Sequence, residues 1–429
     1  MPVDKHLLEQ ILSDQQSELE IFRSRSFCRR AEQSLIDLKS PQAQVVIGVR
    51  RSGKSTLCLQ ALESSRLNYG YVNFDDERLY GLESAQMNDV LEVLFKIKGD
   101  FQHLFLDEVQ NIGGWHLFVN RLLRQGMHII LTGSNARLLS TDLATHLAGR
   151  AKEITLYPFS FADFCAQTQV DTHFKTTRAQ AFRWRAFDSY MNQGGFPELF
   201  LLQDRKTYVR DLADNILKRD IEQRFAITHK ATFEALSHHL LNTAPCTVST
   251  ADLTKTFAIG SVHTVKNYLA YLQQAYLLVG LHPYSPKSRL RAGALKVYPV
   301  DVALMDSRDD AFATRNLGWR LETLVYLQLL RTCKPQGLDI YYYRDRGTEC
   351  DFLVCRNSQV IQAIQVCYDI SGERTRRREI RGLLSAARRS GCSNLLLLTN
   401  HDQGTIRQED HEIIMRPVYD WALDADIAG

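Results

Sequence analysis

The chain has 429 residues, of which 45% are hydrophobic and 24% are charged, so a disordered chain is excluded and about three domains are expected. The net charge of +3 is too small to indicate a nucleic-acid partner, so any case for DNA depends on local basic patches. Nine scattered cysteines form no CxxC pair or zinc-binding spacing, the N-terminus has no secretory pattern, and no stretch reaches the ~18 apolar residues that span a bilayer. A cytoplasmic protein without a membrane span is therefore expected.

The first part of the chain alternates short apolar runs with helical patterns. Apolar residues at helical spacing predict one or two helices over residues 7–38. Five strands are expected at 45–48, 68–76, 103–108, 127–132 and 153–156, with helices between them at 56–62, 83–98, 115–125 and 138–147. This alternation predicts an α/β fold, an open and mostly parallel three-layer sheet that binds ligands at the carboxyl ends of its strands.

A glycine-rich stretch, GVRRSGKS at 48–55, follows the first strand and precedes a helix. It fits the P-loop pattern of Gly, four residues, Gly, Lys and Ser or Thr, in which backbone N–H groups surround nucleotide phosphates. Lys54 is predicted to reach the β and γ phosphates, and the Ser55 hydroxyl to ligate Mg²⁺. The flanking strand and helix disfavour the alternative, a chance glycine loop. The predicted nucleotide-binding residues are Gly48, Val49, Arg50, Arg51, Ser52, Gly53, Lys54, Ser55 and Thr56.

The third predicted strand ends in the acidic pair Asp107-Glu108, and Asn135 follows the fourth. Hydrolysis of a γ-phosphate needs a metal, a positioned water and charge neutralisation. Asp107 is the candidate Mg²⁺ partner, and Glu108 is the candidate base that polarises the attacking water; the alternative for both is an ordinary surface acid pair. Asn135 either orients the same water or is only a turn residue. Arg150, just before the fifth strand, is a candidate arginine finger for a neighbouring subunit.

Beyond a predicted ATPase domain at 1–158, the pattern becomes helical. A helical lid is expected at 159–229 and a winged helix-turn-helix at 230–298, where three short helices precede strand-like residues. The third of these helices, capped by Ser261, is predicted to present Lys266 and Asn267 to DNA. The predicted wing at 287–296 could meet phosphates through its basic residues Lys287, Arg289, Arg291 and Lys296. The alternative is a packing module whose basic loop is only solvated.

Six motifs follow one another along the chain: GVRRSGKST, YVNFDDERL, LFLDEVQNIGGW, ILTGSNARLL, LAGR followed by LYPFSFADF, and GGFPEL. Together they resemble AAA-type ATPases of bacteria and archaea that join a nucleotide domain to a winged helix and a C-terminal domain of uncertain role. The resemblance covers nearly the whole chain. It implies ATP rather than GTP, assembly into a ring or dimer, and the roles given above to Lys54, Ser55, Asp107, Glu108, Asn135 and Arg150.

The last part, 299–429, is mixed α/β, with a helix at 318–330, strands at 340–344, 350–355, 360–368 and 395–399, and a basic helix at 372–390. The C-terminal domain of such proteins is similar to the restriction-endonuclease fold, and Glu322, Asp351 and Gln365 match its metal-binding residues. Cys367 stands where a lysine belongs, and the following helix offers arginines but no lysine nearby. This departure favours an inactive or altered nuclease-like domain, retained for DNA binding through those arginines. The other interpretation of Glu322 and Asp351 is a salt-bridged structural pair.

The leading hypothesis is a Mg²⁺-dependent ATPase, cytoplasmic and homo-oligomeric, that couples its nucleotide state to DNA binding or remodelling. The alternative is a nucleotide-dependent switch that regulates a protein partner, and the third hypothesis is an ATP-gated, metal-dependent DNA nuclease. The basic wing discriminates the first two, because charge reversal at Arg289 and Arg291 abolishes DNA binding only under the first.

Overall fold

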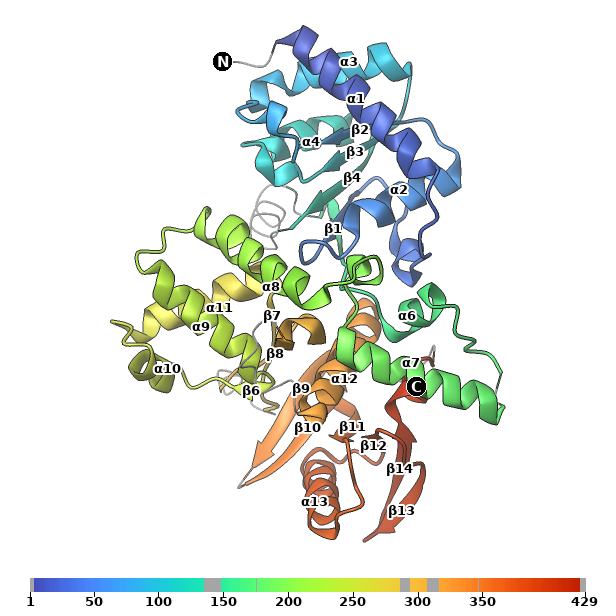
Figure 1. The fold of residues 1–429 in the computed structure, drawn as a ribbon, viewed down its shortest axis with the longest axis vertical. Coiled ribbons are helices and arrows are strands. Elements are labelled where there is room, and N and C mark those ends of the chain that lie inside the picture. The colour runs from blue at the N-terminus through green and yellow to red at the C-terminus, as the bar shows by residue number, and fades with distance from the viewer. Residues whose placement is uncertain are drawn as a thin grey trace. The chain divides into compact units, whose positions relative to one another are not determined.

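The computed structural model describes residues 4–134, 147, 149–174, 176–285, 294–306, 316–345 and 347–424. The chain divides into two compact units (Figure 1). The first comprises Met1–Leu156 with Gln274–Tyr276, and the second comprises Tyr157–Gln273 with Leu277–Gly429. The segments predicted as lid, winged helix and C-terminal domain thus fall largely in the second unit, and the boundaries between them stay predictions. In the part of the chain described, no helix has the length and apolar character needed to cross a membrane.

The first unit is built on a parallel five-stranded sheet in the order β2-β3-β4-β1-β5, which confirms the predicted α/β fold. The strands are β1 Ala43–Ile47, β2 Tyr69–Asn73, β3 His103–Asp107, β4 His128–Gly133 and β5 Ala151–Thr155. The α-helices described in this unit are α1 Lys5–Arg23, α2 Lys54–Ser65, α3 Met87–Lys98 and α4 Trp115–Arg124. Short 3-10 helices lie at Ala31–Leu35, Glu77–Leu79, Ser84–Gln86 and Val109–Asn111. The helix expected at 138–147 lies almost wholly outside the described residues.

Apolar residues on both faces explain why this sheet is parallel and covered by helices. Every residue of β1, and every residue of β3 except His103, is buried. The apolar stripe of α1 is also fully buried at Leu8, Ile11 and Leu12, and each such side chain contributes roughly 1.5–3 kcal/mol to folding. The register pairs Ile47 with Gly133 and Asn73 with Asp107, so four strands end at one edge. That edge is where the P-loop begins.

The second unit starts with helices and continues into a small sheet. The helices are α6 Phe161–Gln167, α7 Thr177–Gln193 and α8 Arg205–Asn215, with a 3-10 turn at Pro197–Phe200, and α8 runs into a π-helical segment, Ile216–Glu222. Then come α9 Lys230–Thr243, β6 Cys246–Thr247, α10 Thr250–Thr256, α11 Val262–Gln274, β7 Leu278–Leu281 and β8 Lys296–Pro299. The strands form an antiparallel sheet in the order β6-β8-β7. Ser261 Oγ accepts a hydrogen bond from the Thr264 N–H at 3.1 Å, as the predicted cap requires.

A six-stranded mixed sheet closes the chain, in the order β13-β14-β12-β11-β10-β9. Its strands are β9 Asp339–Asp345, β10 Thr348–Arg356, β11 Gln359–Cys367, β12 Leu395–Thr399, β13 Gly404–Gln408 and β14 His411–Pro417. Its helices are α12 Leu317–Cys333, α13 Glu373–Ser390 and α14 Val418–Trp421, with 3-10 segments at Val302–Asp306 and Lys334–Gln336. The predictions for 318–390 are close to these bounds, whereas β13 and β14 were not expected.

Buried polar contacts explain the GGFP break after α7. The Gly195 N–H donates to Asp301 Oδ2 at 2.9 Å, and a Cβ on Gly194, whose φ is +80°, would lie 2.0 Å from Asp301 Oδ1. Arg320 on α12, 1% exposed, donates to the Met191 carbonyl at 3.0 Å and pairs with Asp306 at 2.5 Å. These contacts lock α7, the segment around Asp301 and α12 together, because an unpaired buried charge would be costly.

Candidate nucleotide site and a second carboxylate site

The P-loop lies between β1 and α2 at the carboxyl edge of the sheet. Gly48 has a φ of +150°, and a Cβ there would lie only 2.1 Å from the Leu156 carbonyl oxygen, so a side chain at this position has no room. Gly53 adopts a left-handed conformation with φ +92° directly before α2 begins at Lys54. The positive end of α2 therefore starts at the loop, as phosphate binding requires.

Lys54 is held inside the loop by its own backbone. Its Nζ donates to the carbonyl oxygens of Gly48 at 3.2 Å and Val49 at 3.1 Å, and the residue is only 5% exposed. Glu108 Oε1 lies 4.0 Å from the same nitrogen. A buried ammonium that faces carbonyls and one carboxylate is ready to exchange these partners for phosphate oxygens.

Asp107 lies at the end of β3 and receives two hydroxyl donors. Ser55 Oγ donates to Asp107 Oδ1 at 2.9 Å, and the Thr132 hydroxyl on β4 donates to the same oxygen. Burial raises the pKa of Asp107 to about 6, and the charge of Glu108 adds to this effect. Hydroxyl and carboxylate oxygens are the ligands and outer partners that Mg²⁺ prefers, and the cation nearby is the Lys54 ammonium, 4.0 Å from Glu108 Oε1. The site fits a magnesium ion.

Glu108 turns its side chain toward the P-loop through an unusual backbone conformation. Its φ is +52°, in the left-handed region that non-glycine residues rarely adopt. The Glu108 N–H donates to Thr132 Oγ1 at 2.9 Å, and Gln110 donates to its carboxylate. Thr132 thus fixes both acids. Sequence reasoning missed this residue, although its position at the end of a buried strand was a signal.

Three other residues were also predicted to belong to this site: Arg50, Asn135 and Arg150. Arg50 lies 3.5 Å from Asp75, and Asn135 lies outside the described residues. Arg150 is exposed, and its carbonyl accepts a hydrogen bond from the Ala43 N–H at 2.8 Å, at the amino ends of β1 and β5. That edge of the sheet is opposite the P-loop, so Arg150 does not reach the loop of its own chain. An arginine finger toward a neighbouring subunit stays a prediction.

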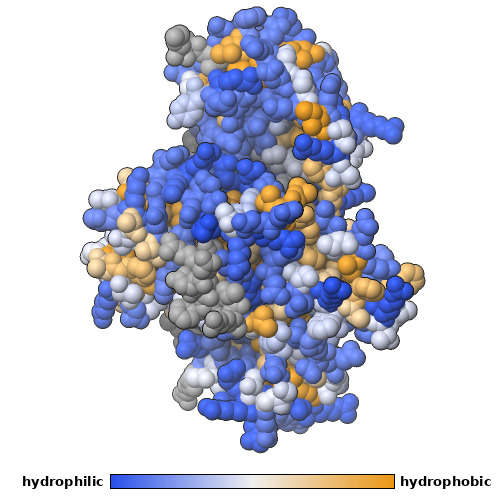
Figure 2. Space-filling model, viewed as in Figure 1, coloured by the Kyte–Doolittle hydropathy of each residue, from blue (hydrophilic) through white to orange (hydrophobic). Residues whose placement is uncertain are grey.

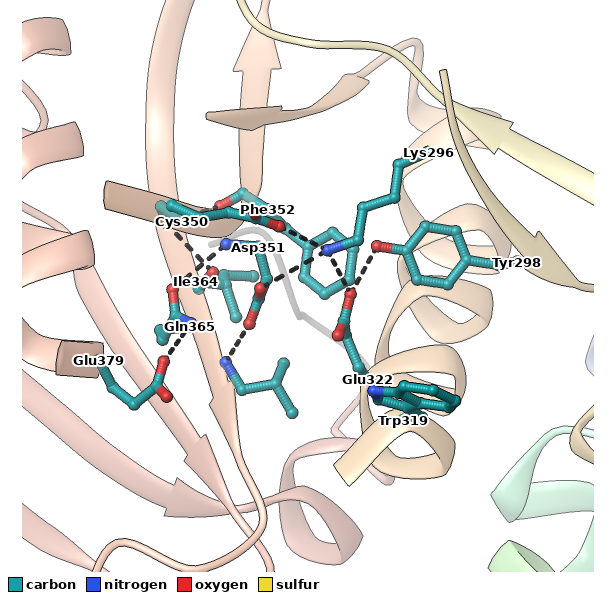
Figure 3. Close-up of polar contacts among 12 residues, drawn as sticks. Lys296, Tyr298, Trp319, Glu322, Cys350, Asp351, Phe352, Ile364, Gln365 and Glu379 are labelled. Atoms are coloured by element: carbon teal, nitrogen blue, oxygen red, sulfur yellow. Dashed lines mark hydrogen bonds and ion pairs between the residues drawn. The ribbon is translucent and has the colours of Figure 1, made fainter. Parts of the chain in front are cut away.

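A second polar cluster lies in the second unit, where Lys296 enters a group of acids (Figure 3). Its Nζ lies 2.8 Å from Glu322 Oε1 on α12, 2.7 Å from Glu349 Oε1 on β10 and 3.9 Å from Asp351 Oδ1 on β10. The Tyr298 hydroxyl also donates to Glu322, at 2.7 Å. Glu349 and Asp351 are two residues apart on one strand, so both side chains face the same side of the sheet. We call these four charged residues the Lys296 cluster.

This cluster corrects two expectations about lysines. Lys296 is only 6% exposed, so it does not belong to a solvated wing that meets phosphates. A lysine does stand beside Glu322 and Asp351, although it comes from β8 instead of β11. Burial lowers the pKa of Lys296, but the charges of Glu322, Asp351 and Glu349 raise it further, and the net pKa lies above its ordinary value. The ammonium is therefore charged at neutral pH.

Gln365 and Cys367 both lie on β11, the strand next to β10 with Asp351. Gln365 Oε1 accepts from the Asp351 N–H at 3.2 Å, and its Nε2 donates to Glu379 at 2.6 Å. The side chains of Gln365 and Cys367 line a cavity of about 780 Å³, together with Glu322, Asp351 and residues of α13. The Cys367 thiol donates to the Asp369 carbonyl, and burial raises its pKa to about 12, so it supplies no charge in place of a lysine.

Metal-ligating geometry is not found at this cluster. In the described part of the chain, no three or more His, Cys, Asp or Glu side chains are arranged to hold a metal ion. Asp351 directs Oδ2 at the Val366 N–H at 2.9 Å, and burial followed by the charge of Glu322 raises the pKa of Asp351 well above its ordinary value. The cation among these acids is Lys296, which weakens the predicted metal site at Glu322, Asp351 and Gln365.

The residues predicted to bind DNA are only partly described. Lys266 is exposed and Asn267 half-buried on α11, where both stay candidates. Lys287, Arg289 and Arg291 lie outside the described residues.

Comparison with protein families matches residues 40–165 to the AAA domain. Residues 185–313 match a Domain of unknown function (DUF8612), and residues 317–419 match another, DUF4143. The match at 40–165 contains the P-loop, Asp107 and Glu108. Because it is an AAA domain, it shows that the first unit is a P-loop ATPase domain that binds ATP. The domain matches do not identify a winged helix or a nuclease.

Two relatives that match most of the chain are themselves named as uncharacterized. An uncharacterized protein of Haemophilus influenzae is 28% identical over 357 residues, which cover 79% of this chain and 86% of the relative. Among solved structures, the Walker-type ATPase PABY2304 of Pyrococcus abyssi has 17% identity and a TM-score of 0.43, covering 66% of this chain and 98% of that one. Cdc6p of Pyrobaculum aerophilum has 13% identity and a TM-score of 0.24, covering 63% and 88%. The uncharacterized protein MJ1544 of Methanocaldococcus jannaschii is 30% identical over 437 residues, 98% of this chain and 96% of the relative. The chain belongs to the same family as MJ1544, and its first unit carries the AAA domain.

Proposed function

We propose that this chain is a Mg²⁺-dependent enzyme that hydrolyses ATP to ADP and phosphate. The observation that carries the proposal is the convergence of Lys54, Ser55, Asp107 and Glu108 at one sheet edge. Two short distances describe it: 2.9 Å from Ser55 Oγ to Asp107 Oδ1, and 4.0 Å from Lys54 Nζ to Glu108 Oε1. The cation, the hydroxyl and both carboxylates that phosphoryl transfer to water needs are thus within reach of one another.

Each residue has a distinct role in this reaction. The loop N–H groups and Lys54 bind the phosphates and neutralise their charge. Ser55 and Asp107 would hold Mg²⁺, which supplies charge stabilisation at the transferring phosphate. Glu108, fixed by Thr132 and Gln110, orients a water and accepts its proton.

Steady-state ATP turnover of Glu108→Gln tests this assignment. We expect a loss of about 10²–10⁴-fold, because general-base catalysis contributes on this scale, while nucleotide binding persists. Glu77→Gln is the matched control, since Glu77 is exposed in the same unit and the chemical change is identical. Turnover within about twofold of the unaltered protein in Glu108→Gln would refute the role of Glu108.

We further propose that the nucleotide state is coupled to DNA. Support comes from the exposed Lys266 on α11 and from the basic residues of α13. ATP turnover measured with and without single-stranded and double-stranded DNA tests the coupling. Stimulation by DNA supports it, and turnover that is indifferent to both forms of DNA would favour the alternative, a switch that acts on a protein partner. The homo-oligomeric state is part of the same proposal, and it is measured by light scattering with and without ATP.

For the Lys296 cluster we propose a structural role: its salt bridges hold β8 against the C-terminal sheet, and we call this role the clasp. The observation that favours it is that Lys296 Nζ already lies 2.7–2.8 Å from two of the carboxylates. An ATP-gated nuclease would instead cut DNA with Mg²⁺ or Mn²⁺. Incubation of supercoiled DNA with the protein, ATP and either ion decides between them, because nicking that disappears in Asp351→Asn would overturn the clasp as the sole role.

A further inference from the structure

Helix α13 concentrates positive charge beyond anything else on the described chain. It carries seven arginines and two glutamates, a net charge of +5 in 18 residues, whereas the whole 429-residue chain has a net charge of +3. Its apolar face, with Ile380, Leu383 and Ala387 buried, packs against the six-stranded sheet. The arginines are therefore not needed for packing, and the surface over α13 at the lower end of Figure 2 is hydrophilic.

The arginines of α13 line a groove of about 870 Å³ that faces β13. Its basic lining consists of Arg374, Arg377, Arg378, Arg381 and Arg388, and we call it the arginine groove. Its other lining residues are the acids Glu373 and Glu409, the polar Thr375 and Gln408, and the apolar Leu384, so the five arginines outnumber the acids. Protein interfaces have an apolar or aromatic core, whereas nucleic-acid interfaces are polar and strongly positive. The lining thus fits a nucleic acid better than a protein.

Ion pairs engage three of the five arginines of the groove, and one of the three, Arg378, is held by the buried Glu379. Arg377 pairs with Glu373 and Arg388 with Glu409, but these side chains are 49–77% exposed, so each pair contributes little and exchanges readily for another anion. Among the described residues, no carboxylate forms a salt bridge with Arg374 or Arg381, both of which are exposed.

The spacing of the arginines suits a polymer of anions. Arg374, Arg381 and Arg388 recur at seven-residue intervals, so they lie on one helix face about 10 Å apart and span about 21 Å at a rise of 1.5 Å per residue. A single phosphate or nucleotide can contact only one of these three arginines, whereas a phosphodiester backbone can contact all three.

We propose that the arginine groove binds the sugar-phosphate backbone of a nucleic-acid strand. The proposal rests on the proposed coupling to DNA and assigns the contact to α13 in addition to α11. Thr375, Arg378 and Arg381 also line the cavity of the Lys296 cluster, so the two cavities adjoin. The carboxylates there repel phosphates, which confines the backbone to the arginine side.

Fluorescence anisotropy of the full chain with labelled single-stranded and duplex oligonucleotides, at several salt concentrations, tests the groove. We expect Arg374→Glu with Arg381→Glu to weaken binding by at least tenfold and to reduce the salt slope by about 2, one for each lost phosphate contact. The matched control is Arg376→Glu with Arg389→Glu, on the same helix and with the same change in charge but outside the groove lining. The control should bind within about threefold of the unaltered protein.

Four outcomes would refute the proposal that the arginine groove binds a nucleic-acid backbone. They are unchanged binding in the groove variant, an equal loss in the control variant, failure of Arg374→Lys with Arg381→Lys to retain binding in a folded protein, and equally tight binding of polyglutamate. ATP turnover separates this proposal from the proposed function. If oligonucleotide binding depends on the arginine groove but ATP turnover does not respond to DNA, the groove proposal is supported and the proposed coupling of nucleotide state to DNA is refuted. If DNA still stimulates ATP turnover in the groove variant, the coupling is supported and the groove proposal is refuted.

Discussion

Replacing Lys296 with methionine tests the electrostatics of the cluster directly. Methionine keeps most of the side-chain volume and removes the charge, so packing changes little and Glu322, Glu349 and Asp351 lose their cation. Removing one partner of a buried ion pair costs about 3–5 kcal/mol, and Lys296 is 6% exposed. We therefore expect Lys296→Met to lower the free energy of unfolding of the second unit by about 3–5 kcal/mol at pH 7.5.

Urea unfolding followed by circular dichroism measures this loss. Lys334→Met is the matched control, because Lys334 pairs with Asp339 at 3.3 Å but both side chains are about half exposed, so less than about 1 kcal/mol is expected. A Lys296→Met loss no larger than that of Lys334→Met would refute the reasoning. Adding Glu349→Gln to Lys296→Met should recover part of the loss, since one uncompensated charge is removed.

The sign of the pH dependence follows from the direction of each pKa shift. The pKa of Lys296 is raised, so its contribution is complete at neutral pH and is lost only when the pH rises through that raised value. The pKa of Asp351 is also raised, by burial and then by Glu322, so ionised Asp351 destabilises the fold and protonation relieves this. The loss in Lys296→Met should therefore shrink as the pH falls from 7.5 toward 5.

Three further predictions concern the first unit. Gly48→Ala should abolish ATP binding and lower the free energy of unfolding, because its Cβ would lie 2.1 Å from the Leu156 carbonyl oxygen; normal ATP affinity by calorimetry would contradict this. Thr132→Val should reduce ATP turnover more than ATP affinity, because it removes a donor to Asp107 and an acceptor for the Glu108 N–H; an equal loss of both would show that Thr132 only shapes the loop. Asp107→Asn should stabilise the nucleotide-free protein at pH 7.5 by up to roughly 3 kcal/mol, because the pKa of Asp107 is raised from 3.8 to about 6, and this gain should vanish as the pH falls toward 4. A less stable Asp107→Asn protein in urea unfolding at pH 7.5 would refute that reasoning.

The nucleotide site was predictable because its information is local. GVRRSGKS and the Asp107-Glu108 pair each follow a buried strand, and a parallel sheet brings such ends to one edge. Thr132 escaped prediction because its role depends on β4 lying beside β3, and strand order is not written in the spacing of the motifs.

Lys296 was misinterpreted because a count of basic residues ignores burial. It begins the strand β8, whose four residues are all buried, and its partner Glu349 is 53 residues further along the chain. The apolar neighbours Val297 and Tyr298 were the available signal. The strands β13 and β14 were missed for a different reason: β13 is mostly exposed, so it lacks the apolar alternation that marks a strand.

The two clusters of acids differ in how closely a lysine ammonium neutralises them, and this difference suggests different roles. At Asp107 and Glu108 the nearest ammonium, Lys54, lies 4.0 Å from Glu108 and is held by two carbonyls, and the pKa of Asp107 rises to about 6. Such a site gains stability from an added divalent cation and an added phosphate together. At Glu322 and Glu349 the ammonium of Lys296 is already in contact, so an added cation would have to compete with this lysine for the carboxylates. We therefore expect a divalent cation to bind at Asp107 in the first unit and not at the Lys296 cluster in the second.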